Sequence, residues 1–475
     1  MKYYMTINKK MYTYFIILLL FLYSCARGKN NKVIENQRPN IIYILADDLG
    51  YGDLSCYGQM KFSTPNIDKL AQKGMIFTQH YSGSTVCAPS RSVLMTGQHT
   101  GNTPIRGNKK LPLPAESITL AEILKEKGYV SGAFGKWGMG SIGSEGDPLN
   151  QGFDRFYGYI DQNLAHSYYP YFLWDDREKV ILNGNKGKAT GDYSPNLIHE
   201  KALDFLDKNK NNPFFLYYPS TIPHAELVAP KSYMDKYKGT LGPDVPYKGV
   251  DDGPKYRKGP SGSQEFPHAA FAAMINLFDD QVGEIMHKVE ELGLADNTLI
   301  IFSSDNGPHK EGGADPDYFD SNSIYRGYKR DLYEGGIRVP MIASWPNKIK
   351  SNTKTEHISA FWDVLPTIAD LLDLKVEENI DGISFLPTLL GTKPQKEHEY
   401  LYWEFHERRG RQALRYGKWK LVRYNVNESG DYELYNLELD PSETKNVIKN
   451  HPKMAKKLID QLNKSRTPSE VFQFK

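Results

Sequence analysis

Cysteine is scarce in this sequence, and its scarcity limits how the fold can be stabilised. The 475 residues include three cysteines, Cys25, Cys56 and Cys87. Cys25 lies in a predicted targeting segment, which leaves two thiols for the folded protein. A framework of several disulfides is therefore excluded as a source of stability.

An excess of charge of one sign is also missing. The 59 lysines and arginines nearly balance the 57 aspartates and glutamates, so the formal net charge is +2. This balance gives no argument for nucleic acid or a membrane surface as a general partner, and basic residues that matter for function must act locally. The length exceeds one ordinary core and predicts one large domain with a smaller one.

The apolar run near the N terminus, residues 15–22, is too short to span a bilayer. It follows three lysines, as in a signal peptide. The stretch Leu22–Cys25 resembles a bacterial lipobox, so residues 1–25 are predicted to be a lipoprotein signal peptide with Cys25 as the lipidated N terminus. Ordinary secretory cleavage near the same position is the alternative.

Residues 26–38 read as a polar, basic tether. The tether lacks the acidic run that marks surface export in some lipoproteins. The predicted location is therefore the bacterial periplasm, with membrane contact only through a lipid anchor at Cys25; surface exposure or secretion is the alternative. The folded protein is expected to comprise a catalytic domain at 39–395 and a C-terminal subdomain at 396–475.

Continuous apolar runs in the larger domain are typical of strands buried on both faces of a parallel sheet. Because these runs alternate with helical patterns, they predict an α/β fold with a large, doubly wound, mostly parallel sheet flanked by helices. In the C-terminal subdomain, short runs between turn residues predict a smaller antiparallel sheet, followed by a closing helix. The apolar runs of the large domain include residues 40–46, 130–134, 214–218 and 297–304, and the longest helical pattern covers 269–292.

Cys87 lies where a loop is expected to enter a helix. Pro89 suits a first helical turn, because its missing N–H would be unpaired there. Cys87 would then face the positive end of the helix, which favours anions, and Arg91 adds a fixed cation one turn on. The pattern is that of a nucleophile beside an anion site. A buried cysteine at an ordinary junction is the alternative.

Oxygen ligands follow two of the predicted buried strands. Asp47 and Asp48 come directly after the first strand, and Asp305 and Asn306 come directly after a later one. The carboxyl ends of parallel strands meet at one edge of a sheet, where ligands bind. Three carboxylates and an amide oxygen, without a competing cluster of histidine and cysteine, favour Ca²⁺ or Mg²⁺ over zinc.

Several short motifs, in order along the chain, resemble those of the type I sulfatases of the alkaline phosphatase superfamily. Residues 87–91 match the C-x-P-S-R signature, and residues 94–97 are similar to the segment that follows it. Lys136 lies in G-K-W, His224 follows a proline as in the P-H motif, and Lys329 begins K-x-x-x-Y-E-G-G. The resemblance covers nearly all of the chain after the tether and implies an alkaline-phosphatase-like fold.

The resemblance implies that Cys87 is oxidised to formylglycine by a formylglycine-generating enzyme or a radical maturase. It implies hydrolysis of a sulfate monoester by the hydrated aldehyde, with cations stabilising the sulfuryl group. His224 would help to protonate the leaving oxygen, and Asp305 would take the proton of the attacking hydroxyl. The implied catalytic residues are Cys87, Arg91, Lys136, His224, Lys329 and Asp305. The implied Ca²⁺ ligands are Asp47, Asp48, Asp305, Asn306 and residue 87.

The sequence departs from the family pattern at Gly138. Many members read G-K-W-H-x-G, and that histidine is the base of the last step, which frees sulfate. His166 and His99 are the candidates to replace it, and His166 is favoured because it lies in an aromatic loop soon after Lys136. The alternatives are that the elimination is assisted in another way or that turnover is impaired.

The expected substrate is a sulfated saccharide. Lys136, His166, His224 and Lys329 are predicted to contact it, and Glu404 and His406, together with Gln412, are predicted to reach over the cleft and bind sugar hydroxyls. The alternative is that these last three are ordinary exposed residues of a strand. A phosphomonoester or phosphonate-ester hydrolase of the same superfamily is the nearest alternative. A non-catalytic protein that binds sulfated glycans is another.

Overall fold

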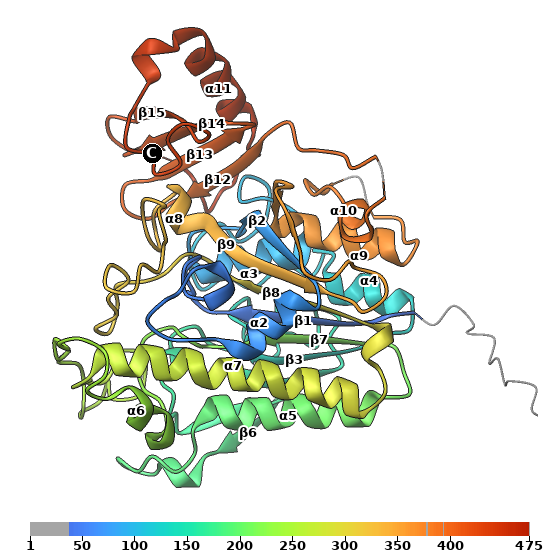
Figure 1. Cartoon of the computed structure of the whole chain (residues 1–475), viewed down its shortest axis with the longest axis vertical. Helices are drawn as coiled ribbons and strands as arrows, with labels where there is room; N and C mark the ends of the chain where they lie inside the picture. Colours follow the sequence, from blue (N-terminus) through green and yellow to red (C-terminus); the bar gives the residue numbers. More distant parts are fainter. Residues whose placement is uncertain (1–37, 377–378, 393, 475) are drawn as a thin grey trace, which may run out of the picture. The chain divides into compact units, whose positions relative to one another are not determined.

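The computed structural model describes residues 38–376, 379–392 and 394–474. The predicted signal peptide, with Cys25, and nearly all of the predicted tether lie outside the described residues. Residues 39–475 form one compact unit, which contains an eleven-stranded and a four-stranded sheet (Figure 1). Among the helices that the structure describes, none has the length and apolar character needed to cross a membrane.

The large sheet runs in the order β10-β2-β9-β8-β1-β7-β3-β4-β5-β6, and β11 pairs with β2 beside this path. Strands β8, β1, β7, β3 and β4 are parallel neighbours, which confirms the predicted mostly parallel sheet. Strand β9 is antiparallel to β2 and β8, and β5 and β6 add an antiparallel edge, so the sheet is mixed. The bounds are β1 (Asn40–Ala46), β2 (Met75–Tyr81), β3 (Val130–Lys136), β4 (Arg155–Tyr159), β5 (Phe172–Asp175), β6 (Glu178–Ile181), β7 (Phe214–Pro219), β8 (Thr298–Ser304), β9 (Arg338–Ser344), β10 (Thr353–Thr355) and β11 (Ser359–Ala360).

Both faces of this sheet carry a hydrophobic core, because successive side chains of a strand point to opposite faces. Along β1, Ile41, Tyr43 and Leu45 belong to one core and Ile42 and Ile44 to the other. The first core includes side chains of α3 (Cys87–Thr96), α4 (Leu120–Glu126) and α9 (Val364–Leu371). The second includes side chains of α2 (Pro65–Gln72), α5 (Ser194–Asn209) and α7 (Pro267–Glu291). Shorter helices are α6 (Lys231–Tyr237), α8 (Glu334–Ile337) and α10 (Leu386–Leu390).

Local chemistry sets the ends of these elements. Helix α4 begins at Leu120 because Thr119 forms a capping box with Glu122, in which each side chain accepts the other residue's backbone N–H. Helix α7 begins at Pro267, which needs no hydrogen-bond partner in a first turn. The aromatic loop predicted around His166 ends at β5, because Phe172–Asp175 pairs with β6 and β4.

The smaller sheet consists of β12 (Leu401–Phe405), β13 (Arg411–Tyr416), β14 (Trp419–Tyr424) and β15 (Asp431–Asn436), paired antiparallel in chain order. Helix α11 (Pro452–Lys464) packs on it through Leu458 and Leu462. These elements confirm the predicted antiparallel sheet and closing helix. Lys420 of β14 ties the sheet to the larger domain, because its buried ammonium lies 2.9 Å from a carboxylate oxygen of Glu334.

Candidate active site

The four predicted metal ligands meet at one edge of the large sheet. Strands β1 and β8 are parallel neighbours with Ala46 opposite Ser304, so the residues after each strand lie side by side. The Asp48 backbone N–H donates to Asp305 Oδ1 at 3.0 Å, and Asn306 Nδ2 donates to Asp48 Oδ1 at 2.7 Å. Asp47 and these three residues are all buried.

Cys87 is the first residue of α3 and faces the same carboxylates. Its thiol lies 3.2 Å from Asp47 Oδ1 and 3.8 Å from Asp48 Oδ1. The helix is buried along its whole length and ends at Gly97, whose φ of 69° gives the left-handed cap. Its N-terminal end therefore directs a positive dipole at the buried carboxylates that Cys87 faces.

Three cations neutralise the carboxylates. Arg91 donates from Nε and Nη2 to Asp305 Oδ2 at 3.0 and 2.8 Å. Lys136 Nζ lies 2.7 Å from Asp47 Oδ2, and Lys329 Nζ lies 2.7 Å from Asp48 Oδ2. All three cations are buried, so their attraction to negative charge is screened little by water.

This environment disfavours ionisation of the Cys87 thiol. Burial, together with the charges of Asp305 and Asp47, raises the pKa of its thiol well above the usual value. A cysteine that serves as a nucleophile is normally found where its pKa is lowered. The unmodified thiol is therefore held protonated.

The donor set fits a hard divalent cation. Asp47, Asp48, Cys87 and His224 each offer a ligand atom, and these atoms lie within 4.8 Å of one another. The Oδ1 atom of Asn306 is buried and accepts no hydrogen bond among the described residues, although a buried amide oxygen normally has a partner. Burial and the charge of Asp47 raise the pKa of Asp305 to about 7, which a bound cation would reverse.

Two histidines stack beside Lys329. The rings of His166 and His224 lie 4.3 Å apart and nearly parallel. His224 Nδ1 donates to the carbonyl of Ala225, which leaves Nε2 to accept from Lys329 Nζ at 2.9 Å. Burial and Lys329 hold the pKa of His224 well below its usual value, and burial with Lys136 lowers that of His166 to about 4. Both rings are thus neutral near pH 7.

The space that a side chain at position 138 would occupy is filled by a residue that the sequence did not point to. The φ of Gly138 is 80°, and a Cβ atom there would lie 2.3 Å from Nε2 of Gln162. Gln162 fills this space and lines the pocket, and its Nε2 atom is buried with no hydrogen-bond partner among the described residues. His99, the second candidate to replace the missing histidine, is absent from the residues that line the pocket; it packs against Trp362.

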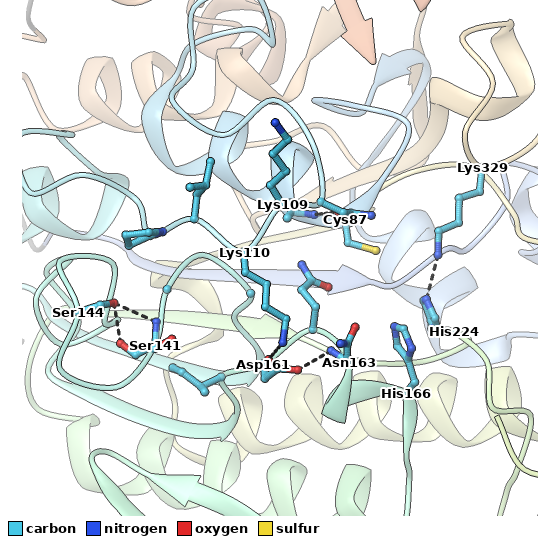
Figure 2. A pocket seen from close by; sticks show the side chains of 18 of the residues that line it. Cys87, Lys109, Lys110, Ser141, Ser144, Asp161, Asn163, His166, His224 and Lys329 are labelled. Atoms are coloured by element: carbon cyan, nitrogen blue, oxygen red, sulfur yellow. Dashed lines mark hydrogen bonds and ion pairs between the residues drawn. The ribbon is translucent and has the colours of Figure 1, made fainter. Parts of the chain in front are cut away.

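The pocket holds further residues that sequence reasoning missed. It is lined by Cys87, His166, His224 and Lys329, and also by Glu311, Lys109 and Lys110 (Figure 2). Glu311 pairs with Lys329 at 3.5 Å, and although burial opposes its ionisation, Lys329 helps to lower its pKa to about 2. The sequence feature that could have pointed to Glu311 was its position six residues after Asp305.

Glu404 and His406, which were expected to bind sugar hydroxyls, lie outside the lining of the pocket that contains Cys87. Glu404 is fully buried and accepts from Arg466 at 2.7 Å, Arg106 at 3.3 Å and His406 at 2.8 Å. Gln412 is also buried and donates to Tyr402. None of these three residues is among those that line the pocket. The backbone N–H of Glu404 donates to Oγ1 of Thr100 at 2.8 Å, and Arg106, its ion-pair partner, donates to the carbonyl of Thr467 at 2.9 Å.

This placement predicts a structural role for Glu404. We expect Glu404→Ala to lower the free energy of unfolding by about 3 kcal/mol, because it leaves the buried Arg106 guanidinium without its carboxylate. KM should change little. Urea unfolding and steady-state kinetics measure the two effects. Glu438→Ala, which removes an exposed partner of Lys418, is the control and should change stability by less than about 1 kcal/mol. A raised KM without loss of stability would contradict this role.

The fold and the site define a hydrolase of alkaline-phosphatase-like architecture, with a residue at a helix start held among carboxylates and cations. The family profile described as Sulfatase matches residues 39–374, and the profile described as N-sulphoglucosamine sulphohydrolase, C-terminal, matches residues 325–468. The chain belongs to the sulfatase family and is a sulfuric ester hydrolase.

Known proteins agree with this assignment. The chain is 32% identical to an N-acetylgalactosamine-6-O-sulfatase of Bacteroides thetaiotaomicron, over 93% of this chain and 96% of that protein. It is 33% identical to human arylsulfatase A, over 80% and 74% of the two chains. A crystal structure of Ps i-CgsB in complex with k-i-k-neocarrahexaose has a TM-score of 0.75 and 28% identity, and the match covers 90% of this chain and 92% of that one.

Proposed function

We propose that this sulfatase removes sulfate from a saccharide, with formylglycine formed from Cys87 as the attacking group and Ca²⁺ as cofactor. The observation that carries the proposal is the placement of Cys87, whose thiol faces Asp47 and Asp48 at the positive end of α3. The saccharide is supported by the Bacteroides relative, named for a sulfate on N-acetylgalactosamine, and by the neighbour bound to a hexaose.

Formylglycine, when present, supplies a hydrated aldehyde whose hydroxyl attacks sulfur. Asp47, Asp48, Asp305, Asn306 and residue 87 would hold Ca²⁺, which would supply positive charge next to that hydroxyl. Three carboxylates and three cations cancel within the site, so a divalent cation would leave it positive and able to bind the anionic sulfate ester. Arg91, Lys136 and Lys329 are fixed before the substrate arrives, which is how charge stabilises a transition state most effectively.

His224 and Lys329 handle the proton of the leaving group. Lys329 donates to Nε2 of His224, so the pair holds a proton where the departing alcohol oxygen would need it. Asp305, whose carboxylate lies beside Asp48 and Arg91, is the proposed acceptor for the proton of the attacking hydroxyl. These groups accomplish the first half of the reaction.

His166 is the proposed base of the step that frees sulfate and restores residue 87. Its Nδ1–H donates to the carbonyl of Gly259 at 3.2 Å, so the neutral ring has Nε2 free as a proton acceptor. It lines the same pocket as Cys87 and stands in for the histidine that Gly138 replaces.

The His166→Ala change should separate the two halves of the reaction. We expect the steady-state rate to fall about 100-fold, the usual contribution of a general base, while the first cleavage of a substrate molecule is slowed much less. Quenched-flow single-turnover and steady-state assays measure the two rates. His99→Ala is the matched control, because this histidine lies outside the pocket. Unchanged rates in both assays would refute the assignment.

A substrate screen tests the proposed function. Protein whose formylglycine content has been verified by mass spectrometry is assayed on sulfated mono- and oligosaccharides and on a matched pair of aryl sulfate and aryl phosphate. Release of sulfate from a saccharide supports the proposal. Turnover of the aryl phosphate in preference to the aryl sulfate, with no saccharide cleaved, would overturn it.

The sequence alone carries two further proposals. The first is a lipid anchor at Cys25 that holds the enzyme in the bacterial periplasm, and the second is a dedicated enzyme that oxidises Cys87. Labelling of cells with a lipid precursor, compared between the native chain and Cys25→Ala, tests the anchor.

A further inference from the structure

One loop brings two lysines into the wall of the pocket that holds Cys87. Lys109 and Lys110 lie on the segment before Leu113 and line the same pocket as Cys87, His224 and Lys329. In Figure 2 the side chain of Lys110 is directed toward Asp161, whereas that of Lys109 is directed to the opposite side. They are separate from the buried cations that face the carboxylates of the metal site.

The loop is anchored at both ends. Arg106, before it, is buried and donates to carbonyls of Thr103 and Thr467. Asn108 Oδ1 accepts from the backbone N–H of Ala88 at 3.4 Å, next to Cys87. Leu113, after it, donates its N–H to Met139 at 2.7 Å. The two lysines are therefore held at a fixed place relative to the reacting residue.

Among the residues that the structure describes, neither lysine makes a strong interaction. Lys110 pairs with Asp161 at 2.9 Å, but the two side chains are 73% and 38% exposed, and an exposed pair contributes little. Lys109 donates to the neutral carbonyl of Val471 and lies over the ring of Phe472. By contrast, Lys329 and Arg330 in the same wall are bound to Glu311.

We propose that Lys109 and Lys110 bind a second anionic group of the saccharide, a uronate carboxylate or a sulfate that is not cleaved, while the scissile sulfate lies at residue 87. This inference rests on the proposed function. One sulfate ester engages the inner cations, so a neutral sugar would leave Lys109 without a counter-charge and Lys110 with only its exposed pair to Asp161. A lysine ammonium on a flexible stem accepts anions of either shape. The enzyme is thereby assigned to saccharides with at least two negative charges.

The test compares three substrates: a monosulfated neutral hexose, the same hexose with a second sulfate, and a monosulfated sugar linked to a uronic acid. The measured quantity is kcat/KM for each charged substrate divided by that for the neutral hexose. We expect Lys109→Ala/Lys110→Ala to lower this ratio about tenfold, because two charge contacts are lost. If the ratio for the disulfated hexose falls, the second group is a sulfate. If the ratio for the sugar linked to a uronic acid falls, the second group is a carboxylate. Added salt should reduce the wild-type ratio, since exposed charges are screened.

Two variants make the comparison specific. Lys109→Arg/Lys110→Arg keeps the charges and should keep most of the preference. Lys453→Ala/Lys456→Ala removes two exposed lysines of α11, gives the same change in net charge and should leave every ratio unchanged. A wild-type enzyme without preference for either charged substrate, or an equal loss on all three substrates in the alanine variant, would overturn the inference.

Calorimetric binding of the same saccharides to Cys87→Ala protein separates the two proposals. If wild-type enzyme with verified formylglycine cleaves none of the three, the proposed function fails on these sugars. Tighter binding of the charged sugars that depends on Lys109 and Lys110 would still establish the anionic subsite, and its absence would refute it.

Discussion

Replacing Cys87 by alanine is expected to slow sulfate release by about 1,000-fold or more, because it removes the residue that becomes the attacking group. The fold should survive, since α3 is held by Val93, Leu94 and Met95 in the core. Mass spectrometry of the wild-type peptide should show that the CH₂SH group of residue 87 has become an aldehyde. Rates of sulfate release and circular dichroism complete the measurement.

Cys56→Ala is the matched control. Cys56 is a free, partly buried cysteine, and it does not line the pocket, so its loss should leave the rate near that of the wild type. Full activity in protein whose Cys87 is entirely unmodified would contradict the formylglycine proposal. Activity retained by Cys87→Ala would contradict any covalent role for this residue.

Loss of the metal site should have the second large effect. We expect Asp47→Asn to weaken Ca²⁺ binding about 100-fold and to lower activity by a comparable or larger factor, because a charged ligand of similar shape is lost. Wild-type protein should melt at a higher temperature as Ca²⁺ is added, since a ligand that binds only the folded state stabilises it. This shift should largely disappear in the variant, as differential scanning calorimetry with and without a chelator would record.

Asp204→Asn provides the control for this change. Asp204 is an exposed carboxylate on α5, and its variant should keep the Ca²⁺-dependent rise in melting temperature. The prediction fails if chelator leaves both activity and melting temperature of wild-type protein unchanged, or if Mg²⁺ alone reproduces the whole effect.

The buried strands and the edge where the ligands gather could be predicted because the evidence for them is local. An apolar run such as 40–46 can bury both faces only inside a sheet, and polar residues directly after it must lie at the carboxyl edge. Pro89 and Gly97 in the same way mark the ends of the helix that begins at Cys87. The antiparallel direction of β9 could not be predicted from local sequence in this way. The direction of pairing depends on how segments far apart in the chain come together in the sheet.

The residues around the reacting group also fall into two sets, those placed by local sequence and those placed by tertiary contacts. The sequence by itself determined the places of five residues in the site, since each lies directly at the end of a strand or the start of a helix. They are Asp47, Asp48, Asp305, Asn306 and Cys87. Only the tertiary structure decided that His166 stacks on His224, that Gln162 fills the space above Gly138, and that Glu404 is buried among arginines. Those facts depend on contacts between segments far apart in the chain, and whether a side chain is buried or open is fixed by what packs against it.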